Sequence, residues 1–97
     1  MKVRRSALAE SDLIDIWLYI AIENPDAADR LLDRIERRTQ LLMTQPLSGV
    51  GRHDLGKDIR QVVIGNYLML YRVEGDGILI LRVLHGKRDL TAENIEE

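Results

Sequence analysis

The spacing of apolar residues changes at Pro46 and divides this 97-residue chain into a helical half and a strand half. Before Pro46, one set of residues recurs at the i, i+3, i+4, i+7 spacing of a helix face: Leu13, Ile16, Trp17 and Ile20. After Pro46, short β-branched and apolar runs separated by glycine turns are typical of strands. The two periods together predict an α+β fold.

The first predicted helix follows a short N-terminal strand over residues 2–6 and runs from Ala7 to about Glu23, with Ser6 as its N-cap. A second apolar stripe on this helix consists of Ile14, Leu18 and Ile22. A helix that is apolar on more than one side indicates a partner, or burial between two layers.

Asn24-Pro25-Asp26 marks the start of a second helix, since Asn caps a helix and Pro is tolerated at its first position. This helix is predicted to end near Thr44. Its apolar face consists of Ala28, Leu31, Leu32, Ile35, Thr39 and Leu42. The short connection predicts an antiparallel helix hairpin.

The second half predicts a loop from Pro46 to about Lys57 and then an antiparallel meander of three strands. The strands span residues 59–64, 67–74 and 78–85, joined by turns at Gly65-Asn66 and at residues 75–77. The later two strands are apolar on both faces, which indicates a sheet covered on both sides. Two helices cover only one face, so we expect something else to cover the other. Another chain is the candidate, with Leu70 in that interface. Residues 86–97 are polar apart from Leu90 and Ile95 and are predicted to be a mobile or partner-docked tail.

The composition excludes several classes of chemistry. The chain has no Cys, so it cannot contain disulfides, thiolate metal sites or cysteine nucleophiles, and His53 and His85 alone do not form a metal site. We expect no cofactor and no metal. No apolar run approaches the ~20 residues of a membrane helix, and no signal peptide is evident. The sequence thus predicts one cytoplasmic domain over residues 1–97.

Charge is divided unevenly along the chain. Residues 52–88 carry seven basic and four acidic groups, a net charge of +3, whereas residues 89–97 carry four acidic groups, a net charge of −4. A basic body with an acidic tail over about 89–97 suggests an anionic partner or target. Ordinary surface charge is the alternative interpretation.

Several motifs, taken in order, resemble the ParE branch of the RelE/ParE toxin superfamily. They are Asp12-Leu13-x-Asp15-Ile16-Trp17-x-Tyr19-Ile20-Ala21, Asn24-Pro25-x-Ala27-Ala28, Pro46-x-x-Gly49-x-Gly51-Arg52, Ile59-Arg60, Tyr71-Arg72-Val73 and Arg82-Val83-Leu84-His85-Gly86-x-Arg88-Asp89. The resemblance implies a non-enzymatic toxin of a type II toxin–antitoxin pair that inhibits DNA gyrase and so blocks replication. It also implies a ParD-like antitoxin that lays a helical segment across the toxin in a hetero-oligomer. Direct nucleic-acid binding by the chain alone is not expected.

The competing hypothesis is a ribosome-dependent mRNA endonuclease of the RelE branch, which would use Arg60, Arg82 and His85. Such an enzyme needs cations for the phosphate and an acid–base group. No tyrosine follows His85, unlike the RelE pattern. A third hypothesis is a degenerate member that only binds an antitoxin or acts in DNA regulation.

The candidate residues for target or antitoxin binding are Arg60, Leu70, Arg72, Arg82, His85, Lys87 and Arg88. For Arg60, Arg72 and Arg82 the alternative is internal pairing with Asp58, Glu74 or the tail acids. For His85 the alternative is a packed structural residue.

Overall fold

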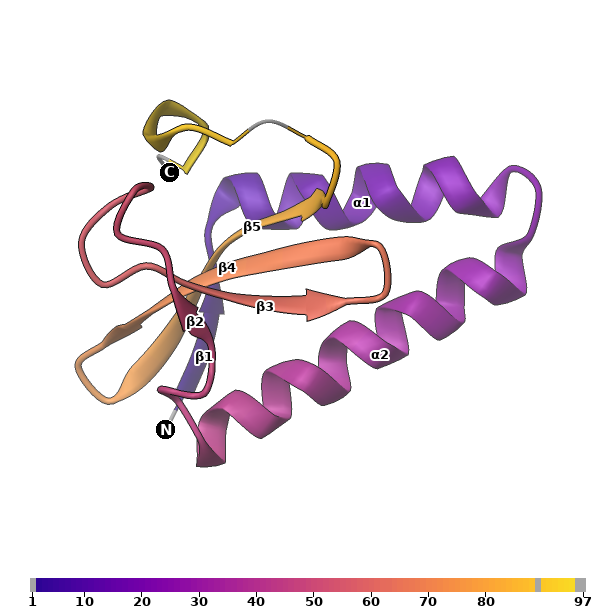
Figure 1. Ribbon diagram of the computed structural model, residues 1–97. Coiled ribbons are helices and arrows are strands. Elements are labelled where there is room, and N and C mark those ends of the chain that lie inside the picture. Colours follow the sequence, from indigo (N-terminus) through magenta and orange to yellow (C-terminus); the bar gives the residue numbers. More distant parts are fainter. Residues whose placement is uncertain (1, 89, 96–97) are drawn as a thin grey trace.

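The computed structural model describes residues 2–88 and 90–95, which form a five-stranded sheet with a helix hairpin on one face (Figure 1). In chain order the elements are β1 (Lys2–Arg5), α1 (Ala7–Ala21), α2 (Pro25–Thr44), β2 (Val50–Gly51), β3 (Arg60–Ile64), β4 (Tyr67–Glu74), β5 (Gly77–His85) and a 3-10 helix (Ala92–Ile95). The spatial order is β1-β5-β4-β3-β2, with β1 parallel to β5 and the other neighbours antiparallel. The predicted fold class is confirmed, and β2 is an unpredicted strand within the expected loop.

Both helices begin where the sequence indicates. The Ser6 side chain accepts a hydrogen bond from the Ala9 N–H at 3.0 Å, and Asn24 accepts one from the Ala27 N–H at the same distance. Each side chain satisfies a backbone donor that the first helical turn leaves unpaired. The two helices diverge from their connecting turn like the arms of a V (Figure 1).

The sheet contains one irregularity, a bulge in β5. Tyr71 pairs with Ile80, but its neighbour Leu70 pairs with Arg82, so Leu81 is an extra residue on β5. A bulge shifts the register of everything beyond it by one position. As a result Tyr67 lies opposite His85, whereas the register at the Gly75-Asp76 end of the hairpin would place it opposite Leu84.

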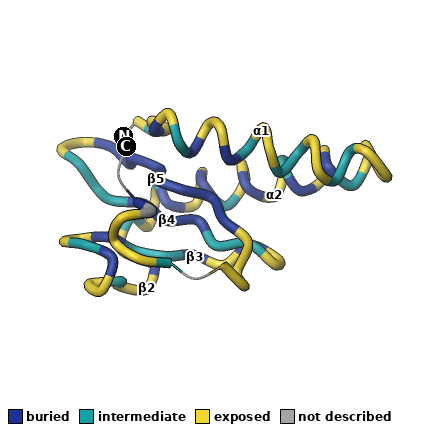
Figure 2. Tube along the Cα trace, turned by 90° about the horizontal axis from the view of Figure 1, so that it is seen from above, coloured by how far each residue is buried: buried dark blue, intermediate teal, exposed yellow. Residues whose placement is uncertain are grey.

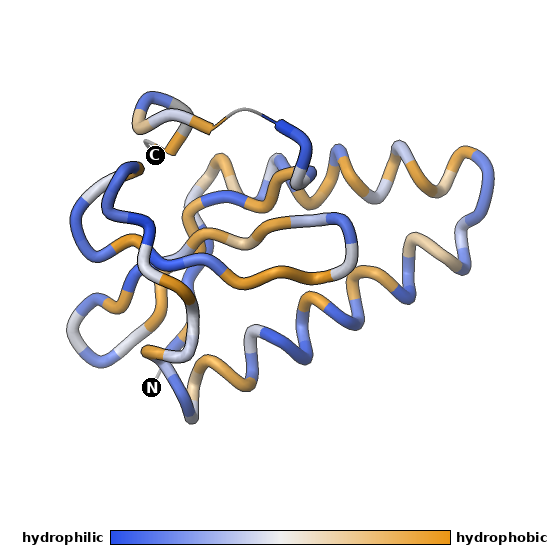
Figure 3. The backbone as a smooth tube through the Cα atoms, in the orientation of Figure 1, coloured by the Kyte–Doolittle hydropathy of each residue, from blue (hydrophilic) through white to orange (hydrophobic). Residues whose placement is uncertain are grey.

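The main core lies between the helices and the sheet. It combines apolar residues of α2 with one face of the strands: Leu31, Ile35, Leu42, Val62, Ile64, Met69, Tyr71, Ile78, Ile80 and Val83. Hydrophobic colour continues along most of β4 and β5 (Figure 3), as expected for strands that are covered on both faces.

The other face of the sheet is covered by the chain itself, so the expectation of another chain on this face is wrong. A second core cluster joins Leu70, Leu79 and Leu81 of the sheet to Leu55 and Ile59 of the loop before β3, and to Ile95 of the 3-10 helix; Leu90 is half-buried against it. Seen from above, the loop and the C-terminal segment lie across the sheet from the helices (Figure 2). The tail, predicted to be mobile or docked on a partner, instead packs on the sheet of its own chain through Ile95 of the 3-10 helix. Its acids Asp89, Glu96 and Glu97 fall outside the described residues.

Candidate functional site

Arg82 is held by the N-terminal half of α1. Its Nε and Nη2 atoms donate to the two carboxylate oxygens of Asp12 at 2.7 and 2.8 Å, and the Val83 N–H donates to the same carboxylate at 3.0 Å. Both side chains are buried. The hydrogen bond to Asp12 raises the pKa of Arg82 further above its ordinary value. The bulge carbonyl of Leu81 accepts from the Ser6 hydroxyl at 2.8 Å, so α1 is fastened to β5 at two polar points.

Arg60 and the motif around Gly49 form a structural unit. Arg60 Nη1 donates to the Leu47 and Gly49 carbonyls at 3.1 and 2.9 Å. The buried Tyr71 hydroxyl donates to the Pro46 carbonyl at 2.7 Å and accepts from the Gly49 N–H at 2.9 Å. A Cβ atom at Gly49 would lie 2.6 Å from that hydroxyl, so only glycine fits. These contacts explain the Pro46-x-x-Gly49 spacing by loop geometry.

Arg72 is paired with Glu74, which also accepts from Arg4 at 2.9 Å. The prediction of internal pairing with Glu74 is therefore confirmed for Arg72. For Arg82 the predicted partners are wrong, because Asp12 of α1 fills that role. Arg72 and Arg82 do not lie opposite each other either, since they pair with Leu79 and Leu70.

Leu70 lies under the loop and the C-terminal segment with no exposed surface. The docking groove that was expected around Leu70 is filled by Leu55, Ile59 and Ile95. Leu70 contributes to the stability of the sheet and offers a partner no surface.

The exposed part of the predicted patch is the turn after β5, with His85, Lys87 and Arg88. The turn is tied to the β3–β4 hairpin by a 2.7 Å hydrogen bond from the Gly86 N–H to the Asn66 carbonyl. The Lys87 N–H donates to His85 Nδ1 at 3.2 Å, so a neutral His85 ring carries its proton on Nε2. Lys87 and Arg88 form no ion pair with any residue that the structure describes, which leaves both charges available to a partner.

A cleft of about 660 Å³ lies between α1 and this turn. Its lining includes Asp15 and Tyr19 of α1, Tyr67 of β4, and His85 and Arg88. The Tyr67 and His85 rings meet edge to face with centroids 5.4 Å apart. Burial raises the pKa of Tyr67, and the nearby Tyr19 raises it further. A tyrosine hydroxyl thus accompanies His85 after all, contributed by a neighbouring strand through the bulge-shifted register.

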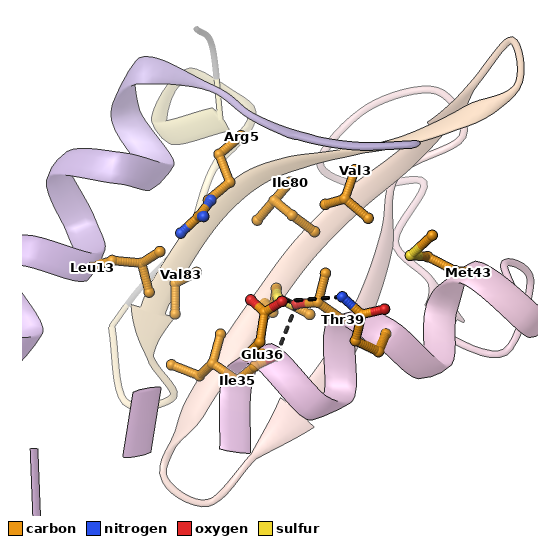
Figure 4. Close-up of a pocket in the computed structure, with 11 residues that line it drawn as sticks. Val3, Arg5, Leu13, Ile35, Glu36, Thr39, Met43, Ile80 and Val83 are labelled. Carbon is orange, nitrogen blue, oxygen red and sulfur yellow. Dashed lines mark hydrogen bonds between the residues drawn. The ribbon is translucent and has the colours of Figure 1, made fainter. Parts of the chain in front are cut away.

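A second hollow lies between the arms of the helix V (Figure 4). It measures about 330 Å³, with an apolar lining that includes Val3, Leu13 and Ile80 and with Arg5 and Glu36 among its polar residues. Leu13 also lines an adjoining apolar hollow of about 290 Å³ on the helix hairpin, with Ile14, Trp17, Leu18 and Leu32. We call these two hollows the helix trough.

The surface around the helix trough is apolar and acidic. Ile14, Leu18 and Ile22 are 60%, 52% and 84% exposed, which confirms that the second stripe of α1 is not covered by this chain. Residues 6–29 contain no Lys or Arg and, besides the buried Asp12, five exposed carboxylates, while Arg5 is a cation in the trough lining. This combination suits a partner segment with apolar and basic side chains.

Two further features bear on the class of protein. Within residues 2–88 and 90–95, no three His, Asp or Glu side chains gather where they could hold a metal ion. No helix in the described part of the chain has the length and hydropathy needed to cross a membrane.

Comparison with known proteins identifies the family. Residues 3–90 match the model described as ParE toxin of type II toxin-antitoxin system, parDE. Toxin ParE3 of Caulobacter vibrioides is 35% identical over 93 residues, which is 95% of this chain and 93% of that protein. Putative toxin Y4kP of Sinorhizobium fredii is 34% identical over 86 residues, covering 87% and 86% of the two chains.

A solved structure supports the fold. The chromosomal ParDE TA system from P. aeruginosa matches with a TM-score of 0.72 at 24% identity, over 88% of this chain and 95% of that chain. The family match spans nearly all of the fold described above, including α1, the Gly49 loop and Arg82. The chain therefore belongs to the ParE toxin family of type II toxin–antitoxin systems.

Proposed function

We propose that this chain acts in the cytoplasm as a toxin that inhibits DNA gyrase without being an enzyme, and that a ParD-like antitoxin neutralises it. Membership of the ParE toxin family supports the toxin assignment, and the ParDE title of the similar structure supports an antitoxin partner.

The dispersal of the predicted nuclease residues carries the non-enzymatic part of this proposal. Arg82 is committed to Asp12, and Arg60 to two loop carbonyls. Ile64 of β3 pairs with Tyr67, which in turn pairs with His85. Arg60 lies four positions from Ile64 along β3, so roughly 13 Å along the strand separates Arg60 from the level of His85. A phosphate held at His85 would therefore lack both predicted cations.

The turn at His85, Lys87 and Arg88 is our candidate for the gyrase contact, because its cations are exposed and unpaired within the described residues. Purified chain should make gyrase accumulate cleaved plasmid, and in cells DNA synthesis should stop before protein synthesis. The double variant Lys87→Glu, Arg88→Glu should lose this effect. Arg30→Glu, a charge reversal on the exposed face of α2, is the control and should still inhibit gyrase.

The helix trough is our candidate for antitoxin docking, in place of the sheet face around Leu70. An amphipathic helix laid in a groove needs apolar anchors and complementary flanks, and the trough offers apolar walls with acidic surroundings. Leu18→Glu should weaken the antitoxin complex by about tenfold or more, because an exposed anchor is replaced by a charge. Val50→Glu, which puts the same charge on an exposed apolar residue of β2 outside the trough, is the control, and an equal loss in both variants would argue against apolar docking at Leu18.

One observation keeps the endonuclease as the second candidate. Tyr67 and Tyr19 lie in the same cleft as His85, so the aromatic hydroxyl missing from the sequence after His85 is present in space. Translation arrest with cut mRNA, abolished by His85→Gln, would establish this alternative and reject gyrase inhibition. If expression affects neither DNA nor protein synthesis, the chain is a binding-only member of the family.

A further inference from the structure

The outer face of α2 carries four arginines, and the acidic residues near them are Asp26 and Asp33, each four positions before Arg30 or Arg37. Arg30, Arg34, Arg37 and Arg38 follow one another at helical spacing, and none forms an ion pair with a described residue. Like charges at neighbouring helix positions repel each other by a few tenths of a kcal/mol per pair. Asp26 and Asp33 offset this repulsion at Arg30 and Arg37, but Arg34 and Arg38 have no acidic residue three or four positions away on α2, so a bound anion would relieve the repulsion most at these two.

Beside these arginines the sheet has a free edge. β2 pairs with Arg60 and Gln61, and within residues 2–88 and 90–95 no strand pairs with the outer edge of β3 from Val62 to Ile64. Ile64 and Tyr67 flank a two-residue turn that begins at Gly65 with φ +58°, so they form a hydrogen-bonded pair. By the alternation of an antiparallel ladder, the backbone N–H and C=O of Val63 then point outward.

A groove of about 340 Å³ joins the arginines to this edge. It is lined by Arg34, Arg37, Arg38, Leu41, Val63 and Ile64. Leu41 and Val63 are 55% and 62% exposed, so the groove has apolar walls between cationic groups. Arg34 reaches the hairpin itself: a Cβ atom at Gly65 would lie 3.2 Å from its Nη1 atom.

We propose that this groove binds an extended, acidic segment of a partner protein, which adds as a short strand to the Val63 edge. The backbone of such a segment would pair with the free N–H and C=O of Val63, as in other cases of strand addition. Its carboxylates would meet Arg37 and Arg38 in charge-assisted hydrogen bonds, and its apolar side chains would contact Leu41 and Val63.

Peptide fits these features better than nucleic acid does. No aromatic ring lines the groove on which a base could stack, and half of its lining is aliphatic. A strand edge also presents a donor and an acceptor side by side, which matches a polypeptide backbone. The arginine groove shares no lining residue with the helix trough, and it meets the His85 turn only at Val63, which also lines a hollow with His85 and Lys87. The arginines of α2 are not part of that hollow, so the Arg38→Glu test does not depend on gyrase or on antitoxin docking.

The test uses the full chain and a fluorescent peptide that alternates Glu and Val, with binding followed by anisotropy at low and high salt. The chain should bind this peptide and not its Lys-Val counterpart. Arg38→Glu should weaken binding by about tenfold, whereas Arg30→Glu, on the same helix but outside the groove, should change it by less than about twofold.

Val63→Pro separates strand addition from simple charge attraction. Proline removes the outward N–H but leaves the hydrogen bonds to β4, as edge strands allow. Binding should fall by about tenfold while the melting temperature stays within a few degrees of the parent. Unchanged peptide binding in this variant, at an unchanged melting temperature, overturns strand addition.

Two other occupants have their own outcomes. An oligonucleotide that binds in preference to the Glu-Val peptide, with Arg38→Glu abolishing its binding, would assign the groove to nucleic acid. If the chain instead forms a concentration-dependent dimer that Val63→Pro dissociates and shows no peptide binding, this result would assign the edge to a second copy of the chain. Either result overturns the proposal.

Discussion

The two helices of the hairpin lie on the same face of the sheet but are attached to it by different means. α2 buries a continuous stripe of Ala28, Leu31, Ile35, Thr39 and Leu42 and turns its arginines outward. α1 buries only Ala9 and Asp12 fully, and exposes Ile14, Leu18 and Ile22. Leu13, Ile16 and Ile20 of α1 pack half-buried against the main core, and the polar contacts at Ser6 and Asp12 add to this smaller apolar contact. The exposed stripe of α1 remains available to a partner.

The largest effect in this comparison should come from removing the buried carboxylate of α1. Asp12→Ala leaves the Arg82 guanidinium and the Val83 N–H without this acceptor, which should lower the free energy of unfolding by about 3–5 kcal/mol. Urea denaturation measures this change. Asp15→Ala, which removes an exposed carboxylate of the same helix, is the control and should cost under about 0.5 kcal/mol. Similar values for the two variants would mean that the ion pair does not anchor α1.

Truncation of an apolar side chain should lower the free energy of unfolding more on α2 than on α1. Leu42 of α2 is fully buried, so Leu42→Ala should cost about 3 kcal/mol in the same assay. Leu18 of α1 is half exposed, and Leu18→Ala should cost less than about 1 kcal/mol. If Leu18→Ala destabilises the isolated chain as much as Leu42→Ala, the exposed stripe of α1 supports the fold and is not reserved for a partner.

The two N-caps offer a finer comparison. Asn24 of α2 is exposed and caps by one hydrogen bond, so Asn24→Ala should cost about 1 kcal/mol. Ser6 of α1 is buried, and its hydroxyl both caps the helix and donates to the Leu81 carbonyl. Ser6→Ala should therefore cost about 2 kcal/mol, because it also leaves a buried carbonyl without its partner. Equal losses in thermal unfolding would show that the bulge contact adds nothing to the cap.

Local signals predicted what lies close together in the chain. Asn24-Pro25 and the glycine turns gave the correct hairpins, and the apolar period located the core face of α2. The cover of the second sheet face was missed because Leu55, Ile59, Leu90 and Ile95 are isolated apolar residues without a period. Leu70 was consequently assigned to a surface that does not exist.

The candidate site is built mainly from contacts between residues far apart in the chain, which local sequence patterns do not predict. Asp12 and Arg82 are 70 positions apart, and their pairing requires α1 to cross the end of β5. The bulge at Leu81 carries no glycine or proline to mark it, yet it decides that Tyr67 faces His85. Lys87 and Arg88 are exposed because their turn leaves the sheet, and their role in binding a target or antitoxin stays a prediction.

The smallest expected effect concerns the far end of α1, where Tyr19 shares the cleft with Tyr67. Burial is the main cause that raises the pKa of Tyr67, and the charge on Tyr19 is the second. The folded chain therefore holds the Tyr67 hydroxyl proton more tightly than the unfolded chain does. The contribution of the protonated Tyr67 to the free energy of unfolding is intact below about pH 10, the pKa of the unfolded state. It is lost as the pH rises through the raised pKa of the folded state. Tyr67→Phe should remove this part of the alkaline loss of stability. Tyr19→Phe should lower the pKa of Tyr67 in a phenolate absorbance titration, since the repulsive neighbour is gone. If the pKa of Tyr67 is the same with and without Tyr19, the Tyr19 hydroxyl does not act on the strand residues of the cleft, and the C-terminal half of α1 contacts the sheet only through apolar packing at Ile16 and Ile20.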